Sequence, residues 1–135
     1  MKAPIAFDFD GTITLTNEYP RCERIRPGIA DCICRLQREG HSIIIHTCRD
    51  TQTRESTQAY MMMVHYLHEN GILNYVINTN VNPQRNFNPR KPWAVIYVDD
   101  CALGWNPDWT GQDIYEQIHL KLDSGHVNPV IFHSK

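Results

Sequence analysis

Two aspartates stand one residue apart where a run of apolar residues ends. Residues 3–7 are apolar, and the octet FDFDGTIT at 7–14 places Asp8 and Asp10 directly after them, followed by Gly11. If the run is a strand, side chains two positions apart point the same way, so both carboxylates start on one face. Carboxylates that close repel in a partly buried site unless a proton or a cation joins them. A hard divalent ion such as Mg²⁺ suits these oxygen ligands, and glycine allows a sharp turn beside it.

Two other interpretations of the aspartate pair compete with a metal site. The calcium-loop motif also begins D-x-D-G, but it requires glycine at its sixth position and glutamate at its twelfth. Those positions are Ile13 and Tyr19 here, which excludes that motif. A strand end with two solvated aspartates in an Asp-Gly turn explains the octet as well as a reactive site does. The octet alone leaves these two alternatives open.

Length, charge and cysteine content limit the class of protein. The chain has 135 residues, a formal net charge of −2 and five cysteines without a C-x-x-C pair. We expect residues 1–135 to form a single domain. The charge disfavours a protein that mainly binds nucleic acid or a membrane surface, and the odd cysteine count favours neither a disulfide framework nor a zinc site. Without a signal peptide or a run long enough to span a bilayer, we expect a cytoplasmic protein.

Short apolar runs alternate with amphipathic segments along the chain. The runs at 4–7, 42–46, 75–78 and 94–98 are rich in branched residues, as strands buried on both faces are. Apolar residues at helical spacing predict three helices, at 29–39, around 59–67 and around 114–122. The alternation predicts an α/β fold with a parallel sheet and right-handed crossovers. A short apolar run at 130–132 either adds an edge strand or packs against the domain.

Polar residues follow three of the four expected strands. In chain order they are Asp8 and Asp10, then Thr47 and Arg49, then Asp99 and Asp100, with Lys91 eight residues before Asp99. In parallel sheets, ligands bind beyond the carboxyl ends of the strands. Loops at strand ends are polar in any case, so each residue alone is weak evidence. Their joint placement predicts a functional site at this edge of the sheet.

These residues resemble, in chain order, the four motifs of the haloacid dehalogenase (HAD) superfamily, most of whose members are Mg²⁺-dependent phosphatases. The matching positions are Asp8-Phe9-Asp10-Gly11-Thr12, Thr47, Lys91 and Asp99-Asp100. Likeness to the small cap-less phosphatase-like proteins of bacterial and phage genomes extends through Tyr19-Pro20, Gly40-His41 and Thr47-Cys48-Arg49. The resemblance covers about the first 100 residues. It implies a three-layer, Rossmann-like (HAD-like) fold around a central parallel sheet, without a large cap domain.

The resemblance also implies catalytic and metal-binding roles. Asp8 would be the nucleophile that attacks phosphorus and carries an aspartyl-phosphate intermediate. Asp10 would protonate the leaving oxygen and then activate water. Mg²⁺ would be held by Asp8, by the backbone carbonyl of Asp10 and by Asp99. Asp100 would act through water or orient its neighbours.

Substrate-binding residues follow from the same motifs. Thr47 and Lys91 would bind phosphoryl oxygens, by hydroxyl and by charge. Arg90 stands beside Lys91 and offers the same charge, so the choice between them rests on spacing. Arg49 and Arg54 could bind a second anionic group, although arginines after a strand are commonly solvated.

Segments between the motifs are too short for a folded cap, so we expect an open site. The substrate would be a phosphorylated small molecule, with a nucleotide or a nucleic-acid end as one form, and no membrane partner is expected. The loop at 101–111 carries Trp105 and Trp109, which either stack on a base or pack at the sheet edge. Packing is the preferred interpretation. The sequence leaves the oligomeric state and the role of the tail after Leu122 open.

A different class of function uses similar residues. Response-regulator receivers take up phosphate with aspartate, threonine and lysine on a similar sheet, without being phosphatases. They place an acidic pair after the first strand and the phosphorylated aspartate after the third, where this chain has Asn78. Chain order therefore favours a phosphatase over a phosphorelay module. It does not exclude a non-hydrolytic phosphate-binding relative of the phosphatases, although every expected catalytic residue type is present.

Overall fold

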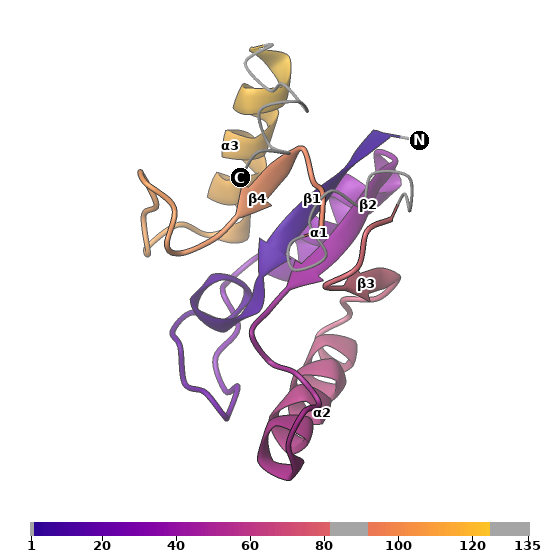
Figure 1. Ribbon diagram of the computed structural model, residues 1–135. Helices are drawn as coiled ribbons and strands as arrows, with labels where there is room; N and C mark the ends of the chain where they lie inside the picture. The colour runs from indigo at the N-terminus through magenta and orange to yellow at the C-terminus, as the bar shows by residue number, and fades with distance from the viewer. Residues whose placement is uncertain (1, 82–91, 125–135) are drawn as a thin grey trace.

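The computed structural model describes residues 2–81 and 92–124 of the chain (Figure 1). Its elements are β1 (Lys2–Asp8), the short turn η1 (Phe9–Ile13), α1 (Ile29–Arg38), β2 (His41–His46), α2 (Arg54–Glu69), β3 (Tyr75–Ile77), β4 (Ile96–Val98) and α3 (Gly111–Asp123). The expected strands and helices are all present, although β4 is shorter than the run at 94–98 suggested. None of the helices in the described ranges has the length and apolar character needed to cross a membrane.

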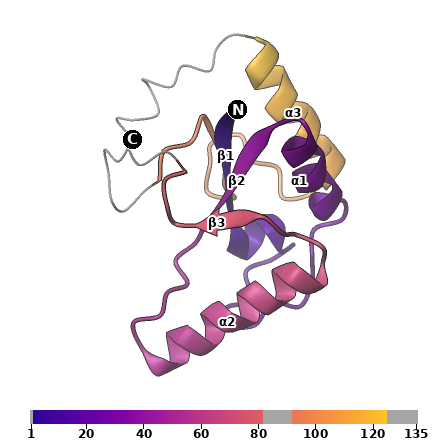
Figure 2. The ribbon, with the colours of Figure 1, turned by 90° about the vertical axis from the view of Figure 1, so that its right-hand side faces the viewer.

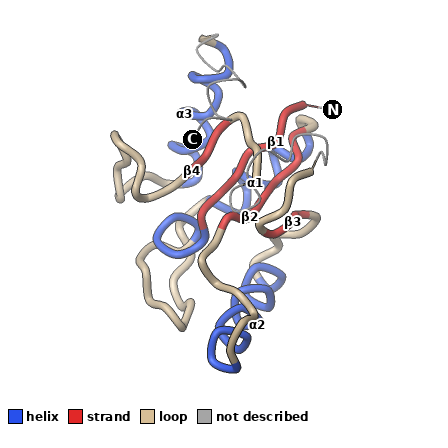
Figure 3. Tube along the Cα trace, in the orientation of Figure 1, coloured by secondary structure: helices blue, strands red, loops and turns tan. Residues whose placement is uncertain are grey.

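The strands form one parallel sheet in the order β3-β2-β1-β4 (Figure 3). In this register Phe7 of β1 lies between Ile45 of β2 and Val98 of β4. Parallel strands present their carboxyl ends at the same edge, so the residues that follow β1, β2 and β4 meet there. Asp8, which ends β1, is therefore flanked by the ends of two other strands.

The main hydrophobic core lies on one face of the sheet. Strands β1, β2 and β4 and all three helices contribute to it, with Phe7, Ile45, Ile33, Met63 and Ile114 among its members. Helices α1 and α3 lie together on this side of the sheet (Figure 2). The amphipathic periodicity of the helices therefore serves a single shared core.

The opposite face of the sheet differs from the expected three-layer arrangement. Ala6, Ile44 and Ala94 form a small cluster there, with Val81 and Tyr97 against it, and no helix contributes to it within the described residues. The expectation assumed helices on both faces, whereas the three described helices all contribute to the core on the other face. Residues 82–91 and 125–135 lie outside the described residues, and with them the run at 130–132.

A short loop connects η1 to α1. It is closed by an antiparallel bridge between Thr14 and Ile25. The amide of Leu15 donates to the carbonyl of Arg24 at 2.8 Å, and the amide of Arg26 donates to that of Ile13 at 2.8 Å. The two sides of the loop are thus paired with each other, and the loop forms no folded cap domain at this position.

The first turns of α1 and α3 meet backbone to backbone. The amide of Gly111 donates to the carbonyl of Pro27 at 2.6 Å. A Cβ on Gly111 would lie 2.0 Å from the carbonyl oxygen of Gly28. Only a residue without a side chain permits this approach, which fixes α3 against α1 on the core side of the sheet.

We expect Gly111→Ala to destabilise the fold. The added methyl group meets rigid backbone, and overpacking of this kind costs about 1–3 kcal/mol in the free energy of unfolding. Urea unfolding followed by circular dichroism measures the change. Gln117→Ala, at an exposed position of the same helix, is the matched control and should shift the midpoint little. Equal midpoints for the two variants would contradict the predicted clash.

Candidate active site

The chain turns sharply after β1. Gly11 has φ of 84°, in the left-handed region that favours glycine. Its amide donates to Oγ1 of Thr14 at 2.9 Å, and the amide of Thr14 donates to the carbonyl of Phe9 at 3.1 Å. These bonds close η1, in which Asp10 and Gly11 depart from helical geometry. The turn holds Asp8 and Asp10 in place at the end of a central strand.

Three carboxylates from two strand ends gather beside this turn, from Asp8 after β1 and from Asp99 and Asp100 after β4. The Thr12 hydroxyl links them, because it donates to Oδ2 of Asp8 at 3.3 Å and accepts from the amide of Asp100 at 2.9 Å. A Cβ on Gly11 would lie 2.4 Å from Oδ2 of Asp100. The glycine of the motif is therefore needed for the close approach of the two strand ends as well as for the turn.

The proximity of these carboxylates changes the acidity of Asp8. Burial first, and then the charge of Asp99 and a contact with Asp100, raise the pKa of Asp8 from 3.8 to about 8. The hydrogen bond from Thr12 acts in the opposite direction. Near neutral pH a nearby cation would favour the charged form of a carboxylate in this setting.

The donor set fits a hard divalent cation. Carboxylate oxygens such as those of Asp8, Asp99 and Asp100 are the ligands that Mg²⁺ prefers, and the raised pKa of Asp8 reflects its burial and the negative charge of its neighbours. Asp99, Asp100 and Cys101 offer ligand atoms within 4.8 Å of one another. A thiol does not suit Mg²⁺, so Cys101 is not an expected ligand.

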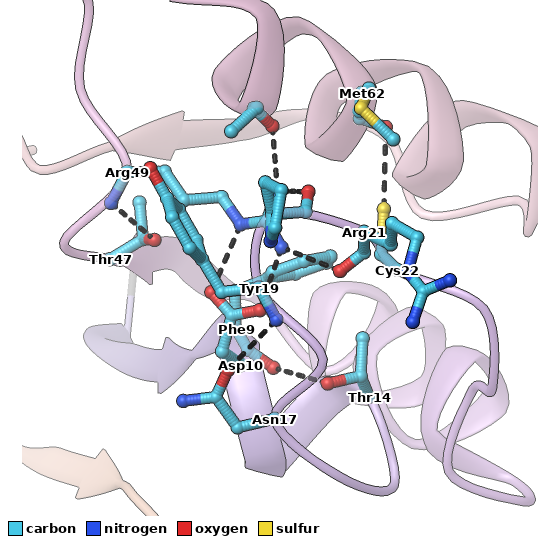
Figure 4. A network of polar contacts seen from close by, with 12 residues as sticks. Phe9, Asp10, Thr14, Asn17, Tyr19, Arg21, Cys22, Thr47, Arg49 and Met62 are labelled. Carbon is cyan, nitrogen blue, oxygen red and sulfur yellow. Dashed lines mark hydrogen bonds and ion pairs between the residues drawn. The ribbon is translucent and has the colours of Figure 1, made fainter. Parts of the chain in front are cut away.

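Asp10 points its side chain elsewhere. Both of its carboxylate oxygens accept hydrogen bonds from Arg49, Oδ2 from Nε at 3.0 Å and Oδ1 from Nη2 at 2.8 Å (Figure 4). Arg49 therefore orients the Asp10 side chain, and the metal-binding role expected for the backbone carbonyl of Asp10 stays a prediction.

The structure corrects the expected role of Arg49. We expected this residue to bind an anionic group of the substrate, but it is 1% exposed. Its guanidinium bonds to Asp10 and to backbone carbonyls of the chain. Arg54 opens α2 and is exposed. Lys91 and Arg90 lie outside the described residues, so the cation expected from the third motif stays a prediction.

Thr47 lies at the expected edge and is held by a residue that the motifs did not identify. Its backbone amide donates to Oδ1 of Asn78 at 2.9 Å, and its carbonyl accepts from Nδ2 of Asn78 at 2.8 Å. The Thr47 hydroxyl accepts from the amide of Arg49 at 3.0 Å, which leaves its own proton to donate. Asn78 ends the third apolar run, so the strand-end rule could have found it.

The tryptophan loop after β4 is packed and anchored. The rings of Trp105 and Trp109 meet edge to face, with centroids 5.4 Å apart, and both side chains pack against the main core. Buried Arg26 donates to the carbonyls of Trp109 and Pro107 at 2.7 and 2.8 Å, and to that of Thr12 at 2.7 Å. The preferred packing interpretation agrees with this arrangement. Arg26 thereby ties the loop to the turn that follows β1.

A pocket adjoins the gathered carboxylates on the open side of β4. It has a volume of about 270 Å³, and Asp99, Trp105 and Trp109 are among its lining residues together with apolar and polar groups of α3. Its position next to Asp99 gives space for an organic group beside the site.

Fold and site together define a class of protein, an α/β protein with an acidic site at the carboxyl edge of a parallel sheet. Comparison with known proteins agrees with the fold. A solved structure of a conserved protein from Bacteroides thetaiotaomicron is similar, with a TM-score of 0.71 and 28% sequence identity over 90% of this chain and 93% of that one. No protein-family model and no curated protein sequence matches the chain. A fold hosts many functions, so function has to be argued from the site.

Proposed function

We propose that the protein is a Mg²⁺-dependent phosphatase of the HAD superfamily that hydrolyses a phosphomonoester through an aspartyl-phosphate on Asp8. The observation that carries this proposal is the position of Asp8. It ends a central strand, beside the carboxylates of Asp99 and Asp100, with its pKa raised to about 8. Ionised Asp8 combines the nucleophile with the anionic site that a cofactor cation needs.

The chain's own residues would divide the reaction between them. Asp8 would attack phosphorus while the ester bond to the leaving oxygen breaks, and Asp10 would protonate that oxygen. Thr47 would donate its hydroxyl proton to a phosphoryl oxygen. A bound Mg²⁺, held by Asp8, Asp99, Asp100 and the backbone carbonyl of Asp10, would neutralise charge on the phosphoryl group.

The second half of the reaction regenerates the enzyme. Water would attack the phosphorus of the aspartyl-phosphate, and the bond between phosphorus and the Asp8 oxygen would break, with its electron pair returning to the carboxylate. Asp10 would take the proton from the attacking water. The products are inorganic phosphate and the free Asp8 carboxylate.

The substrate we propose is a phosphorylated small molecule, with a nucleotide or a nucleic-acid end as the specific form to test. The pocket beside Asp99 offers space for its organic part, next to two tryptophans. A nucleobase in this pocket would contact their exposed edges, since the rings already pack against each other and the core.

Phosphate release from a broad panel of phosphorylated metabolites, nucleotides and end-phosphorylated oligonucleotides tests the activity. We expect release with Mg²⁺ and a loss of about 10²-fold or more with EDTA, because the site cannot tolerate an ionised Asp8 and a phosphate without a cation. Release that is unaffected by EDTA would contradict the metal dependence. A long-lived phosphoenzyme without any released phosphate would favour the non-hydrolytic phosphorelay module instead.

A further inference from the structure

Arg49 is a buried arginine beside the candidate active site. Its side chain is fully buried, yet all its N–H groups find acceptors (Figure 4). Besides the two bonds to Asp10, Nη1 donates to the carbonyls of Pro20 and Ala59 at 2.8 and 2.7 Å, and Nη2 donates to that of Arg21 at 2.9 Å. One guanidinium thus joins three segments of the chain: η1, helix α2, and the loop that precedes α1.

These contacts fix the orientation of the guanidinium plane. A planar fork with five bonds to three segments cannot rotate without breaking several of them. The rings of Phe9 and Tyr19 lie against it, 5.1 and 5.0 Å from Cζ. Because both oxygens of Asp10 bond to this fork, the plane of the carboxylate is fixed as well.

The fixed carboxylate keeps the capacity that a base needs. Each carboxylate oxygen has about two lone pairs, and Arg49 uses one on each. The Asp10 side chain is 15% exposed whereas that of Arg49 is 0% exposed. Asp10 is therefore held from its buried side and open on the other.

We propose that Arg49 is a positioning residue that orients Asp10 for the hydrolysis of the phosphoenzyme, an inference that rests on the proposed phosphatase function. In that step the water oxygen bonds to phosphorus, the phosphorus–Asp8 bond breaks with its electrons returning to Asp8, and the water proton passes to a free lone pair of Asp10. Arg49 contacts neither phosphorus nor water. Its contribution is to present that lone pair in one orientation.

Lysine cannot replace this function. Arg49→Lys keeps the positive charge beside Asp10, but a single ammonium cannot bond to both carboxylate oxygens and three carbonyls in a plane. The variant therefore separates the charge from the geometry. Arg38→Lys, at an exposed position of α1, is the matched control.

The experiment is rapid-mixing kinetics with p-nitrophenyl phosphate and Mg²⁺. Because p-nitrophenolate leaves without protonation, formation of the phosphoenzyme needs little from Asp10, whereas its hydrolysis needs a base. We expect Arg49→Lys to give a burst of about one equivalent of p-nitrophenolate per enzyme, followed by a steady rate reduced by about 10²-fold or more. Acid-quenched mass spectrometry should show phosphate on Asp8 accumulating in this variant. Wild type and Arg38→Lys should show neither the burst of p-nitrophenolate nor the accumulation of phosphate on Asp8.

A second comparison separates positioning from a general structural role. Asp10→Asn should reproduce the burst and the slow steady rate. Adding Arg49→Lys to Asp10→Asn should lower the steady rate by less than about 3-fold further, since Arg49 acts only through Asp10. If Arg49→Lys does not fold, Asp10→Asn/Arg49→Gln, which buries no unpaired charge, is compared with Asp10→Asn in the same way. If the two substitutions lower the steady rate independently, so that their losses multiply, or if Arg49→Lys behaves like wild type, the positioning role of Arg49 is overturned while the proposed function stands. Absence of turnover in the wild type would overturn the proposed function, and this inference with it.

Discussion

Asp8→Asn is expected to abolish phosphate release while the protein stays folded. Asparagine has nearly the same shape as aspartate but cannot attack phosphorus, so turnover should fall by about 10³-fold or more, as the loss of a nucleophile does. Phosphate release with the best substrate of the panel, with Mg²⁺ present, measures the effect. Acid-quenched mass spectrometry should find phosphate on Asp8 in the Arg49→Lys variant, where the phosphoenzyme accumulates, and none once Asp8→Asn is added to it.

The fold should tolerate this exchange because of the surroundings of Asp8. The side chain lies against Thr12, which can also donate to the amide oxygen of asparagine. The exchange removes one of three crowded negative charges, so no buried partner loses its compensation. Asp108→Asn, in the exposed part of the loop after β4, is the control and should keep wild-type turnover. Turnover of Asp8→Asn within tenfold of wild type would refute Asp8 as the nucleophile.

The sequence predicted the parts of the site that depend on the strands being parallel. Branched runs such as 42–46 and 94–98 have few ways to be buried other than as strands of a parallel sheet. Parallel strands present their carboxyl ends at the same edge of the sheet, so the sequence predicts Asp8 and Asp99 at one edge. Their convergence with Asp100 is therefore a consequence of local pattern and topology.

Arg49 shows what the sequence could not predict. An arginine after a strand is usually solvated, and its burial here depends on carbonyls of Pro20, Arg21 and Ala59, which belong to other segments. Arg26 is buried for the same reason, through carbonyls on both sides of the tryptophan loop. Such networks are set by the tertiary fold, and no spacing rule identifies them. Within residues 2–81 and 92–124 no helix contributes to the cluster on the second face of the sheet. The sequence could not predict this, because periodicity gives the apolar side of a helix without saying which face of the sheet it packs against.

Without a divalent cation, the stability of the fold should decrease as the pH rises from about 4 to about 8. Asp8 has a pKa near 8 in the folded protein and 3.8 as its ordinary value, so between these values the folded state holds a proton that the unfolded state has lost. The stabilisation from this proton is fully present below pH 3.8 and is lost as the pH rises through the folded pKa near 8. The slope for one group is at most about 1.4 kcal/mol per pH unit.

The difference between wild type and Asp8→Asn isolates this effect from other titrating groups. In EDTA the two should melt at similar temperatures near pH 4, where Asp8 is protonated. The variant should then melt progressively higher than wild type up to about pH 8, above which the difference stays constant. Added Mg²⁺ should raise the melting temperature of wild type most at high pH, because it binds the ionised carboxylate, and should raise that of the variant less. Thermal melts across this pH series, with Asp108→Asn as control, measure both trends. A constant difference between wild type and Asp8→Asn at every pH would show that Asp8 is not held in the crowded, cation-demanding setting on which the phosphatase proposal depends.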